Sequence, residues 1–393
     1  MVLLLVALGT LAGVSLANKG VDAWVYAYAG LDHFYNLEYE SSIANLRQAL
    51  ELAPDNPIFL NFLANAYLFQ ELNRTGQLDA QLYSESNPFL RSEKPQLDPV
   101  VMQAVKSLVG RTKDICRQRL RQNAQDKIAL YALGIAYGIE ANYEFTMYKH
   151  WYAALKAANK AKEYHARLKE LDPNYHDANL VLGVYEYAVG SIPAAVKWLA
   201  FLVGYRGSKE RGIELLHTAV KHGKLVTTDA AVLLAVIYNR EKKYGYVRQL
   251  LRTLSTYYPR NYLLPLEIAR TYLKEENAAA ALAEYSAIAA QVEARAPGYE
   301  RVPRDRLYYQ LGALHQRQRN YTKALAAFDQ VTTESGANSV LTAYARMRKA
   351  EIYLAQNKLD KARQEYQHVL TMPYPEPRAQ AQQVLRALDQ RKP

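Results

Sequence analysis

Residues 228–259 read TDAAVLLAVIYNREKKYGYVRQLLRTLSTYYP. Apolar side chains recur every three or four positions along this stretch, a spacing that predicts helices and not the alternation of a strand. Pro259 closes the stretch, because proline restricts the residue before it and cannot continue the hydrogen-bond ladder of a helix. The stretch therefore predicts two antiparallel helices followed by a stop.

The pattern returns along the chain in nearly the same register. A second copy begins at Tyr262, a third follows after a nine-residue expansion, and a fourth contains Tyr353 and Tyr366. A small residue recurs at the eighth place of each first helix, where it lets the second helix approach closely: Gly30, Ala64, Gly134, Gly183, Ala235, Ala269, Gly312 and Ala350. Such helix pairs cannot bury their apolar faces alone, so neighbouring pairs must stack into one continuous core.

The recurring aromatic, Leu-Gly, Tyr, Ala, Phe and Pro positions resemble the tetratricopeptide repeat, whose period is about 34 residues. The resemblance implies an all-α, right-handed superhelical solenoid of about seven antiparallel helix pairs, with two irregular insertions and a C-terminal capping helix. It also implies a binding scaffold whose concave groove holds a partner.

Departures from the repeat divide the chain into six expected segments. These are a signal peptide or anchor at 1–17, N-terminal repeats at 18–69, a polar connecting loop at 70–99, an irregular helical region at 100–227 with insertions at 143–151 and 190–212, regular repeats at 228–375, and a capping helix at 376–393.

The N-terminal segment is an apolar run that ends in Ser15-Leu16-Ala17. Small residues at the last and third-last places are typical of a signal-peptidase site, which favours export and a mature chain beginning at Asn18. No Lys or Arg precedes the run, so an uncleaved membrane anchor stays the alternative. The expected location is the bacterial periplasm, or the membrane if the segment is retained.

The formal net charge of +11 favours anionic partners. A basic stripe is expected on one face of the helix near residues 99–123: Lys106, Lys113, Arg117 and Arg121. Attraction to an anionic membrane or another polyanion is one interpretation, and a solvated helical surface that happens to be basic is the other.

Enzymatic motifs are absent from the sequence. It contains no His-Glu-x-x-His, no Gly-x-Ser-x-Gly and no Walker loop. The eight histidines show no ligand spacing, and the one cysteine, Cys116, falls on the apolar side of its helix. We therefore expect no catalysis, no metal, no cofactor and no small-molecule substrate, and nucleic acid is disfavoured.

Partner contacts are implied by the resemblance, since the family lines its groove with fixed positions of each first helix. Carried onto this chain, these positions give Asn61, Asn65, Asn239, Arg240, Arg270, Arg306, Tyr309, Arg317, Tyr344 and Met347. Paired carboxamides can grip an extended peptide, and arginines can pair with carboxylates. The alternative is that these side chains only solvate an open groove. The family's clamp for chaperone tails is not reproduced.

The segment around residues 192–212 departs most from the repeat. Pro193 is expected to start a short helix that is apolar on nearly every face and contains Trp198 and Phe201, followed by a glycine-rich return that presents Arg206, Lys209 and Arg211 outward. This segment is either a plug inside the superhelix or a docking element. The sequence as a whole predicts a non-enzymatic envelope scaffold for a protein or acidic peptide partner, with an envelope-surface or polyanion-binding protein as the alternative.

Overall fold

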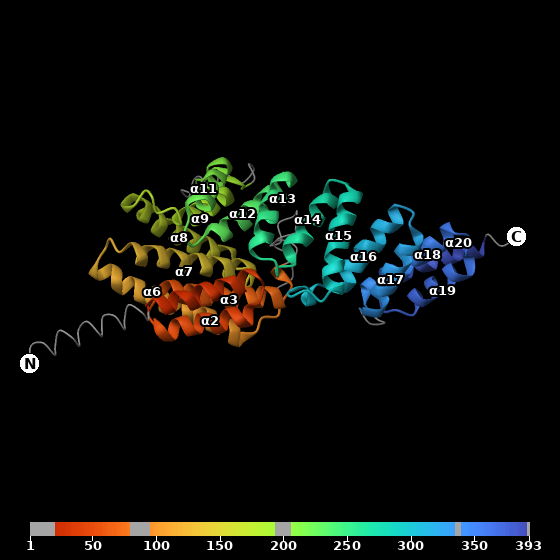
Figure 1. Ribbon diagram of the computed structural model, residues 1–393, viewed down its shortest axis with the longest axis horizontal. Helices are drawn as coiled ribbons and strands as arrows, with labels where there is room; N and C mark the ends of the chain where they lie inside the picture. Colours follow the sequence, from red (N-terminus) through yellow and green to blue (C-terminus); the bar gives the residue numbers. More distant parts are fainter. Residues whose placement is uncertain (1–19, 79–94, 193–205, 335–338, 391–393) are drawn as a thin grey trace, which may run out of the picture. The chain divides into compact units, whose positions relative to one another are not determined.

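The computed structural model describes residues 20–78, 95–192, 206–334 and 339–390. Within these ranges every regular element is a helix and none is a strand, as Figure 1 shows. The chain divides into two compact units, Met1–Tyr258 and Pro259–Pro393. The prediction of an all-α fold is confirmed.

Unit 1 begins with helical residues 20–35. The helices that follow are α2 (Tyr39–Leu52), α3 (Pro57–Arg74), α6 (Pro99–Gln122), α7 (Lys127–Thr146), α8 (Trp151–Leu171), α9 (Ala178–Gly190), α11 (Lys209–His222), α12 (Thr227–Arg240) and α13 (Tyr244–Tyr257). Local sequence explains several starts. The side chains of Asn56 and Asp98 each accept hydrogen bonds from two backbone N–H groups, and a proline follows each cap at the first helical position.

Unit 2 continues the same alternation of first and second helices. It contains α14 (Leu263–Lys274), α15 (Ala278–Glu293), the 3-10 turn η1 (Tyr299–Arg301), α16 (Arg304–Arg317), α17 (Tyr321–Glu334), α18 (Val340–Ala355), α19 (Leu359–Leu370) and α20 (Pro375–Asp389). Gly298, with φ of +88°, precedes η1, and a Cβ there would lie 2.1 Å from the carbonyl oxygen of Arg260. Only glycine therefore fits where this expansion folds back over the chain.

In the helix pairs whose small residue is glycine, that glycine of the first helix lies against a large side chain of the second. A Cβ on Gly312 would lie 2.6 Å from the ring of Phe328, and one on Gly30 would lie 2.7 Å from Leu46. At the same contact in the α7–α8 pair, Gly134 faces the buried imidazole of His165. A titratable ring thus occupies a place that the other pairs give to an apolar side chain.

The turns inside the pairs share one geometry, in which a single residue adopts a left-handed conformation. Lys242 (φ 57°), Glu276 (58°) and Arg319 (57°) occupy this place in successive pairs, and Lys149 (58°) occupies it between α7 and α8. The sequence predicted an insertion at 143–151. In the structure α7 continues to Thr146 and α8 begins at Trp151, so the aromatic residues lie on a longer hairpin. Its turn is one residue wider than the others, since the N–H of His150 donates to the carbonyl oxygen of Glu144, six residues back, whereas the N–H of Lys243 donates to that of Tyr238, five residues back.

The connection after α3 begins later than residue 70, because the helix continues to Arg74. Its ends are held together by Glu71, whose buried carboxylate accepts two hydrogen bonds from Arg74 (2.7 and 2.6 Å) and one from the backbone N–H of Asp98 (2.7 Å). These bonds hold the pKa of Glu71 below its usual value, against the desolvation that raises it. Most of the connection, residues 79–94, lies outside the described residues.

Helix α20 covers the last apolar face of unit 2. Ala381 of α20 joins the core formed by Met347, Tyr366, Val369 and Met372, and Val384 and Leu385 pack against that core. Without α20 the apolar faces of α18 and α19 would be exposed to water, so the helix has the role of a solenoid cap.

Candidate functional site

In unit 2, the groove positions predicted from the sequence fall into three groups. Arg306 and Arg317 are exposed, Tyr309 and Tyr344 are half-buried, and Met347 is buried. The expectation for Met347 is corrected: it packs in the core with Ala343 and Tyr366 and offers no surface to a partner. Two arginines and two tyrosines therefore remain accessible.

Tyr309 and Tyr344 belong to a polar network across α16, α18 and α20. Arg348 donates to Glu351 at 2.9 Å and is hydrogen-bonded to Tyr309, while Gln316 donates to Glu351 at 3.1 Å. Burial, followed by a hydrogen bond to Glu376, raises the pKa of Tyr344. We call Tyr309, Gln316, Tyr344, Arg348 and Glu351 the unit 2 polar face.

Gln316, Arg348 and Glu351 were not among the residues predicted from the sequence. Gln316 and Glu351 occupy groove positions of the repeat, so the offset rule that selected Tyr309 could have found them. Arg348 lies outside that rule. In the sequence, Arg348 could have been recognised by its position one helical turn before Glu351, because opposite charges at this spacing pair on the surface of a helix.

Arg270 is engaged within its own repeat. It lies 3.8 Å from Glu267 and forms a hydrogen bond with Tyr285, whose pKa is raised by burial above all. Glu267 is buried and also lies 4.0 Å from Lys274. Arg270 therefore serves the packing of α14 on α15, and a carboxylate partner would have to displace these contacts.

In unit 1 the predicted asparagine pair is not presented as a pair. Asn61 is buried at 2% exposure, and its amide donates to the carbonyl oxygen of Ala132 in α7 at 2.8 Å. Asn65 is half-buried. The expectation of a two-asparagine grip is corrected, because Asn61 joins α3 to α7. Asn239 is also buried, and Arg240 is exposed.

A tyrosine–aspartate cluster lies on the first helices of unit 1 and was not predicted. Tyr35 is hydrogen-bonded to Asp229, and its ring lies 5.0 Å from that of Tyr258. Tyr131 and Asp177 add to the field around these groups. Desolvation raises the pKa of Asp229 to about 6, and the hydrogen bond from Tyr35 opposes the shift. The cluster joins the first helix of the unit to α12 and α13, elements far apart in the sequence.

The basic stripe expected on α6 is interrupted. Lys106, Arg117 and Arg121 are exposed, but Lys113 is buried, where it forms an ion pair with Glu140 and lies 4.2 Å from the ring of Tyr137. The expectation for Lys113 is therefore corrected. Arg117 donates to the hydroxyl of Tyr137 at 3.0 Å. Part of the positive charge is thus used to hold neighbouring pairs together.

For the expected docking element, Trp198 and Phe201 lie outside the described residues. Arg206 and Arg211 are exposed, while Lys209 is paired with Glu241 at 2.8 Å, which corrects the expectation that it points outward. The neighbouring glycines have a packing role, since a Cβ on Gly212 would lie 2.6 Å from the backbone nitrogen of Tyr187. They let α9 and α11 cross closely.

The described residues contain no group of three or more His, Cys, Asp or Glu side chains that could hold a metal ion. Cys116 is buried as expected, and desolvation raises the pKa of its thiol to about 12, so it is a poor nucleophile. None of the helices within the described ranges has the length and apolar content needed to cross a bilayer.

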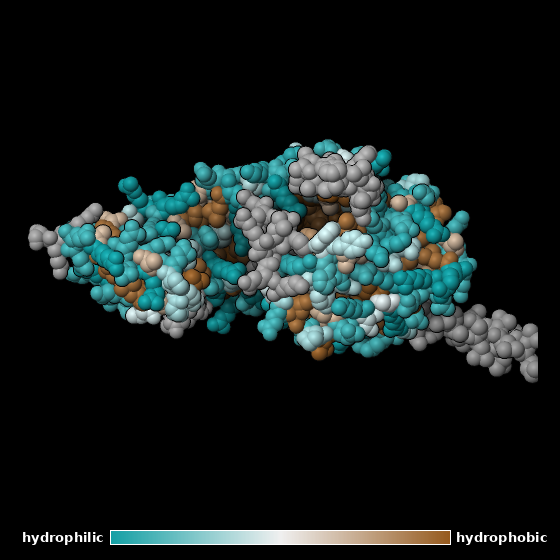
Figure 2. All heavy atoms as spheres, turned by 180° about the vertical axis from the view of Figure 1, so that it is seen from behind, coloured by the Kyte–Doolittle hydropathy of each residue, from teal (hydrophilic) through white to brown (hydrophobic). Residues whose placement is uncertain are grey.

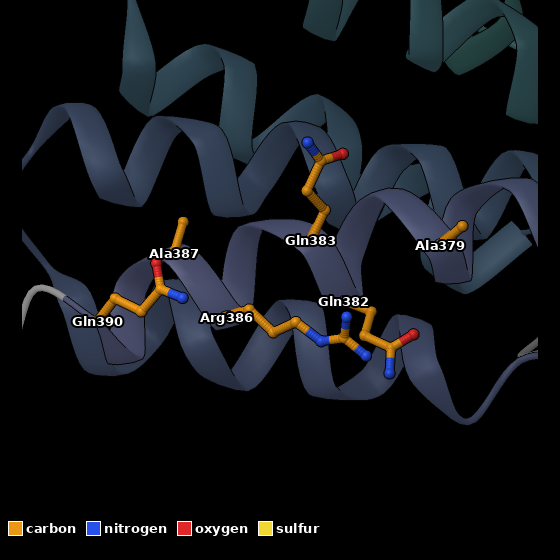
Figure 3. Close-up of a pocket in the computed structure, with 6 residues that line it drawn as sticks. All are labelled: Ala379, Gln382, Gln383, Arg386, Ala387 and Gln390. Carbon is orange, nitrogen blue, oxygen red and sulfur yellow. The ribbon is translucent and has the colours of Figure 1, made fainter.

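A shallow depression of about 370 Å³ lies along α20 (Figure 3). Its lining consists of Ala379, Gln382, Gln383, Arg386 and Ala387 of α20 and of Gln390, which directly follows the helix. Side chains of a single exposed helix face cannot enclose a small ligand, which normally loses most of its surface to a pocket. The depression is the polar outer face of the cap.

Hydrogen-bonding tyrosines, arginines and carboxamides on stacked helix pairs can bind a peptide or a protein surface. This arrangement defines a scaffold of tetratricopeptide repeats, and proteins built from these repeats in general bind protein or peptide partners and are non-catalytic.

The family follows from the comparisons. Residues 142–376 match the model of the Iml2/Tetratricopeptide repeat protein 39 family, and residues 29–75 match a tetratricopeptide repeat model. The first match covers more than half of the chain, and the protein belongs to the Iml2/Tetratricopeptide repeat protein 39 family. No curated protein matches the chain.

Among solved structures, yeast Tom70 is similar at 13% identity and a TM-score of 0.36, covering 94% of this chain and 90% of Tom70. The Cut9–Hcn1 hetero-tetramer of the APC/C gives 14% identity and a TM-score of 0.40, with 86% of this chain covered and 50% of that chain. A tetratricopeptide repeat protein from Parabacteroides merdae gives 14% identity and a TM-score of 0.29, with 83% and 98% covered.

Proposed function

We propose that the protein is a scaffold of the bacterial cell envelope that binds an acidic segment of a partner protein on the unit 2 polar face and its flanking arginines. The observation that carries the proposal is the arrangement on α16 and α18. Helix α16 presents the half-buried Tyr309 together with the exposed Arg306 and Arg317, and Tyr344 of α18 is half-buried as well.

The chemistry of this face suits a peptide with carboxylates. Tyrosine offers a large, rigid contact area together with a polar hydroxyl, which is why it is enriched at interfaces. An exposed guanidinium can bind a carboxylate through two parallel hydrogen bonds. The acidic groups already on this face do not oppose such a ligand, since Glu351 is paired with Arg348 and Glu376 is bonded to Tyr344.

Charge reversal tests the proposal. Full-length protein is used to capture partners from envelope extracts, and Arg306→Glu/Arg317→Glu is compared with the wild type. Repulsion of an acidic segment should abolish capture of the principal partner while leaving thermal unfolding unchanged, because both side chains are exposed. Undiminished capture by the variant would contradict the proposed site.

The control is Lys106→Glu/Arg121→Glu, which reverses two exposed charges of the α6 stripe. It should capture the partner as the wild type does. The opposite result would be that the Lys106→Glu/Arg121→Glu variant alone loses the partner and that binding by the wild type falls steeply from low to high salt, as it does in polyanion complexes. That result would favour an envelope polyanion over an acidic peptide as the ligand.

Export is part of the proposal and is supported by the apolar run that ends at Ala17. N-terminal sequencing of the native protein should find a start at or near Asn18. An intact Met1 in a cytosolic fraction would refute export.

A further inference from the structure

The α7–α8 hairpin extends beyond the length of a regular pair. The left-handed Lys149 lies fifteen positions after Gly134, whereas Arg319 lies seven positions after Gly312. On the return helix, His165, which faces Gly134, lies sixteen positions after Lys149, whereas Phe328 lies nine positions after Arg319. Seven or eight extra residues on each helix lengthen the hairpin by about 11 Å at a rise of about 1.5 Å per residue.

The extended part has a packed base and an exposed tip. Tyr143 and Met147 are buried, and Lys106 of α6 lies over the ring of Tyr148 at 4.3 Å. Beyond them Phe145 (38% exposed), Trp151 (61%) and Tyr152 (68%) face the solvent. We call these three side chains the aromatic tip. On the face seen in Figure 2 the described surface is mainly hydrophilic with small hydrophobic patches, so a projecting group of three large rings needs a specific reason.

The aromatic tip lies in a segment of positive charge that is bounded by Glu144 and by Glu163, which is paired with Lys160 at 2.7 Å. Residues 145–162 contain four lysines (Lys149, Lys156, Lys160 and Lys162) and no Asp or Glu. The nearest carboxylates on α7 are already engaged, since Glu144 lies 2.9 Å from His150 and Glu140 is paired with Lys113. The hairpin end therefore presents aromatic rings with a lysine collar.

From this geometry we propose that the aromatic tip docks on a membrane surface rich in anionic phospholipids. Trp and Tyr have an apolar body and a polar edge, and they concentrate at the level of the lipid headgroups. Lysines next to them add attraction to anionic lipids. A projecting end made of aromatic rings and lysines suits a flat anionic lipid surface, whereas a peptide requires a groove or a strand edge.

The first test is sedimentation of the full chain with vesicles of phosphatidylcholine containing 30% phosphatidylglycerol. The variants Trp151→Ala/Tyr152→Ala and Lys149→Gln/Lys156→Gln should each weaken binding, the lysine pair by about thirtyfold. The matched control is Tyr257→Ala on α13, whose ring is equally exposed at 69%, and it should bind like the wild type. Equal binding by all four proteins, or no binding by the wild type, would overturn the proposal.

A second test separates the aromatic tip from any attachment through residues 1–17. Because Cys116 is buried, a cysteine introduced at the exposed Ala153 is the reactive thiol for an environment-sensitive fluorophore. On anionic vesicles the label at Ala153→Cys should shift to the blue, and a label at the exposed Ala379→Cys of α20 should not. If the protein sediments with the vesicles but the fluorescence of the label at position 153 does not shift, docking by the aromatic tip is refuted. It is also refuted if the aromatic-tip variants lose self-association and keep their binding to vesicles.

Discussion

Two titratable groups in unit 1, the half-buried Asp229 and the buried His165, respond to pH in opposite senses. Asp229 has a raised pKa of about 6, because desolvation disfavours its charge. His165 is fully buried, and desolvation lowers its pKa to about 4. Each side chain therefore favours its neutral form in the folded unit, and each shift is a statement about stability.

Asp229→Asn should stabilise the protein at neutral pH. The stability that comes from the raised pKa is fully present below the unfolded value near pH 4 and is lost as pH rises through about 6. At pH 7.5 the variant should exceed the wild type by roughly 2–3 kcal/mol in urea unfolding, and the gain should vanish at pH 4. The control is Asp360→Asn, an exposed carboxylate that should change little. A gain that is independent of pH would contradict the account.

His165→Leu should stabilise the protein at acid pH, with the opposite pH profile. The lowered pKa contributes stability above the unfolded value of about 6.5, and this stability is lost as pH falls through about 4. Leucine fills the same place in the first pair, where Leu46 faces Gly30. We expect the advantage of the variant to grow by roughly 2–3 kcal/mol between pH 7.5 and pH 4; an advantage that shrinks on acidification would be inconsistent with a neutral buried ring.

Single residues were predicted well where one helix decides their environment. Cys116 was expected on the apolar side of its helix and is buried. Asn61 and Lys113 were misplaced because their surroundings come from α7, through the carbonyl of Ala132 and the carboxylate of Glu140. A helical wheel contains no information about a polar partner on another helix.

At the scale of helices, close crossings rather than turns explain several glycines. Gly212→Ala should destabilise the α9–α11 pair by about 1–3 kcal/mol, because the new Cβ would lie 2.6 Å from the backbone of Tyr187. Gly110→Ala, in the middle of α6, meets nothing within 4 Å and should stabilise the protein by up to about 1 kcal/mol. Thermal unfolding of the two variants measures both effects. If both substitutions changed the stability in the same direction, the packing role given to Gly212 would be contradicted.

Most helices were foreseeable from the repeat, and the hairpin tip was not. The offsets located the pairs from Thr227 to Leu370, since each small residue and its large partner recur at fixed places. The aromatic residues 143–151 broke that register and were taken for an insertion. In the structure α7 continues to Thr146 and α8 begins at Trp151, and Tyr143, Thr146 and Met147 are buried.

At the scale of the whole molecule, the chain is a scaffold of stacked helix pairs, and the family match over residues 142–376 places it among tetratricopeptide repeat proteins. The sequence predicted the fold and the class because both depend on the repeat. It did not place the polar face correctly, since Met347 is buried in the core and since Gln316 and Tyr309 of α16 are hydrogen-bonded to Glu351 and Arg348 of α18.

Site-specific photo-crosslinking tests the central claim most directly. A benzophenone amino acid is placed at Tyr309, at Tyr344 or at the exposed Tyr257 of α13 in cells that produce the full chain. The account predicts one shared protein partner crosslinked from positions 309 and 344 and none from position 257. Adducts from position 257 alone, or the same partner from all three positions, would contradict binding at the unit 2 polar face.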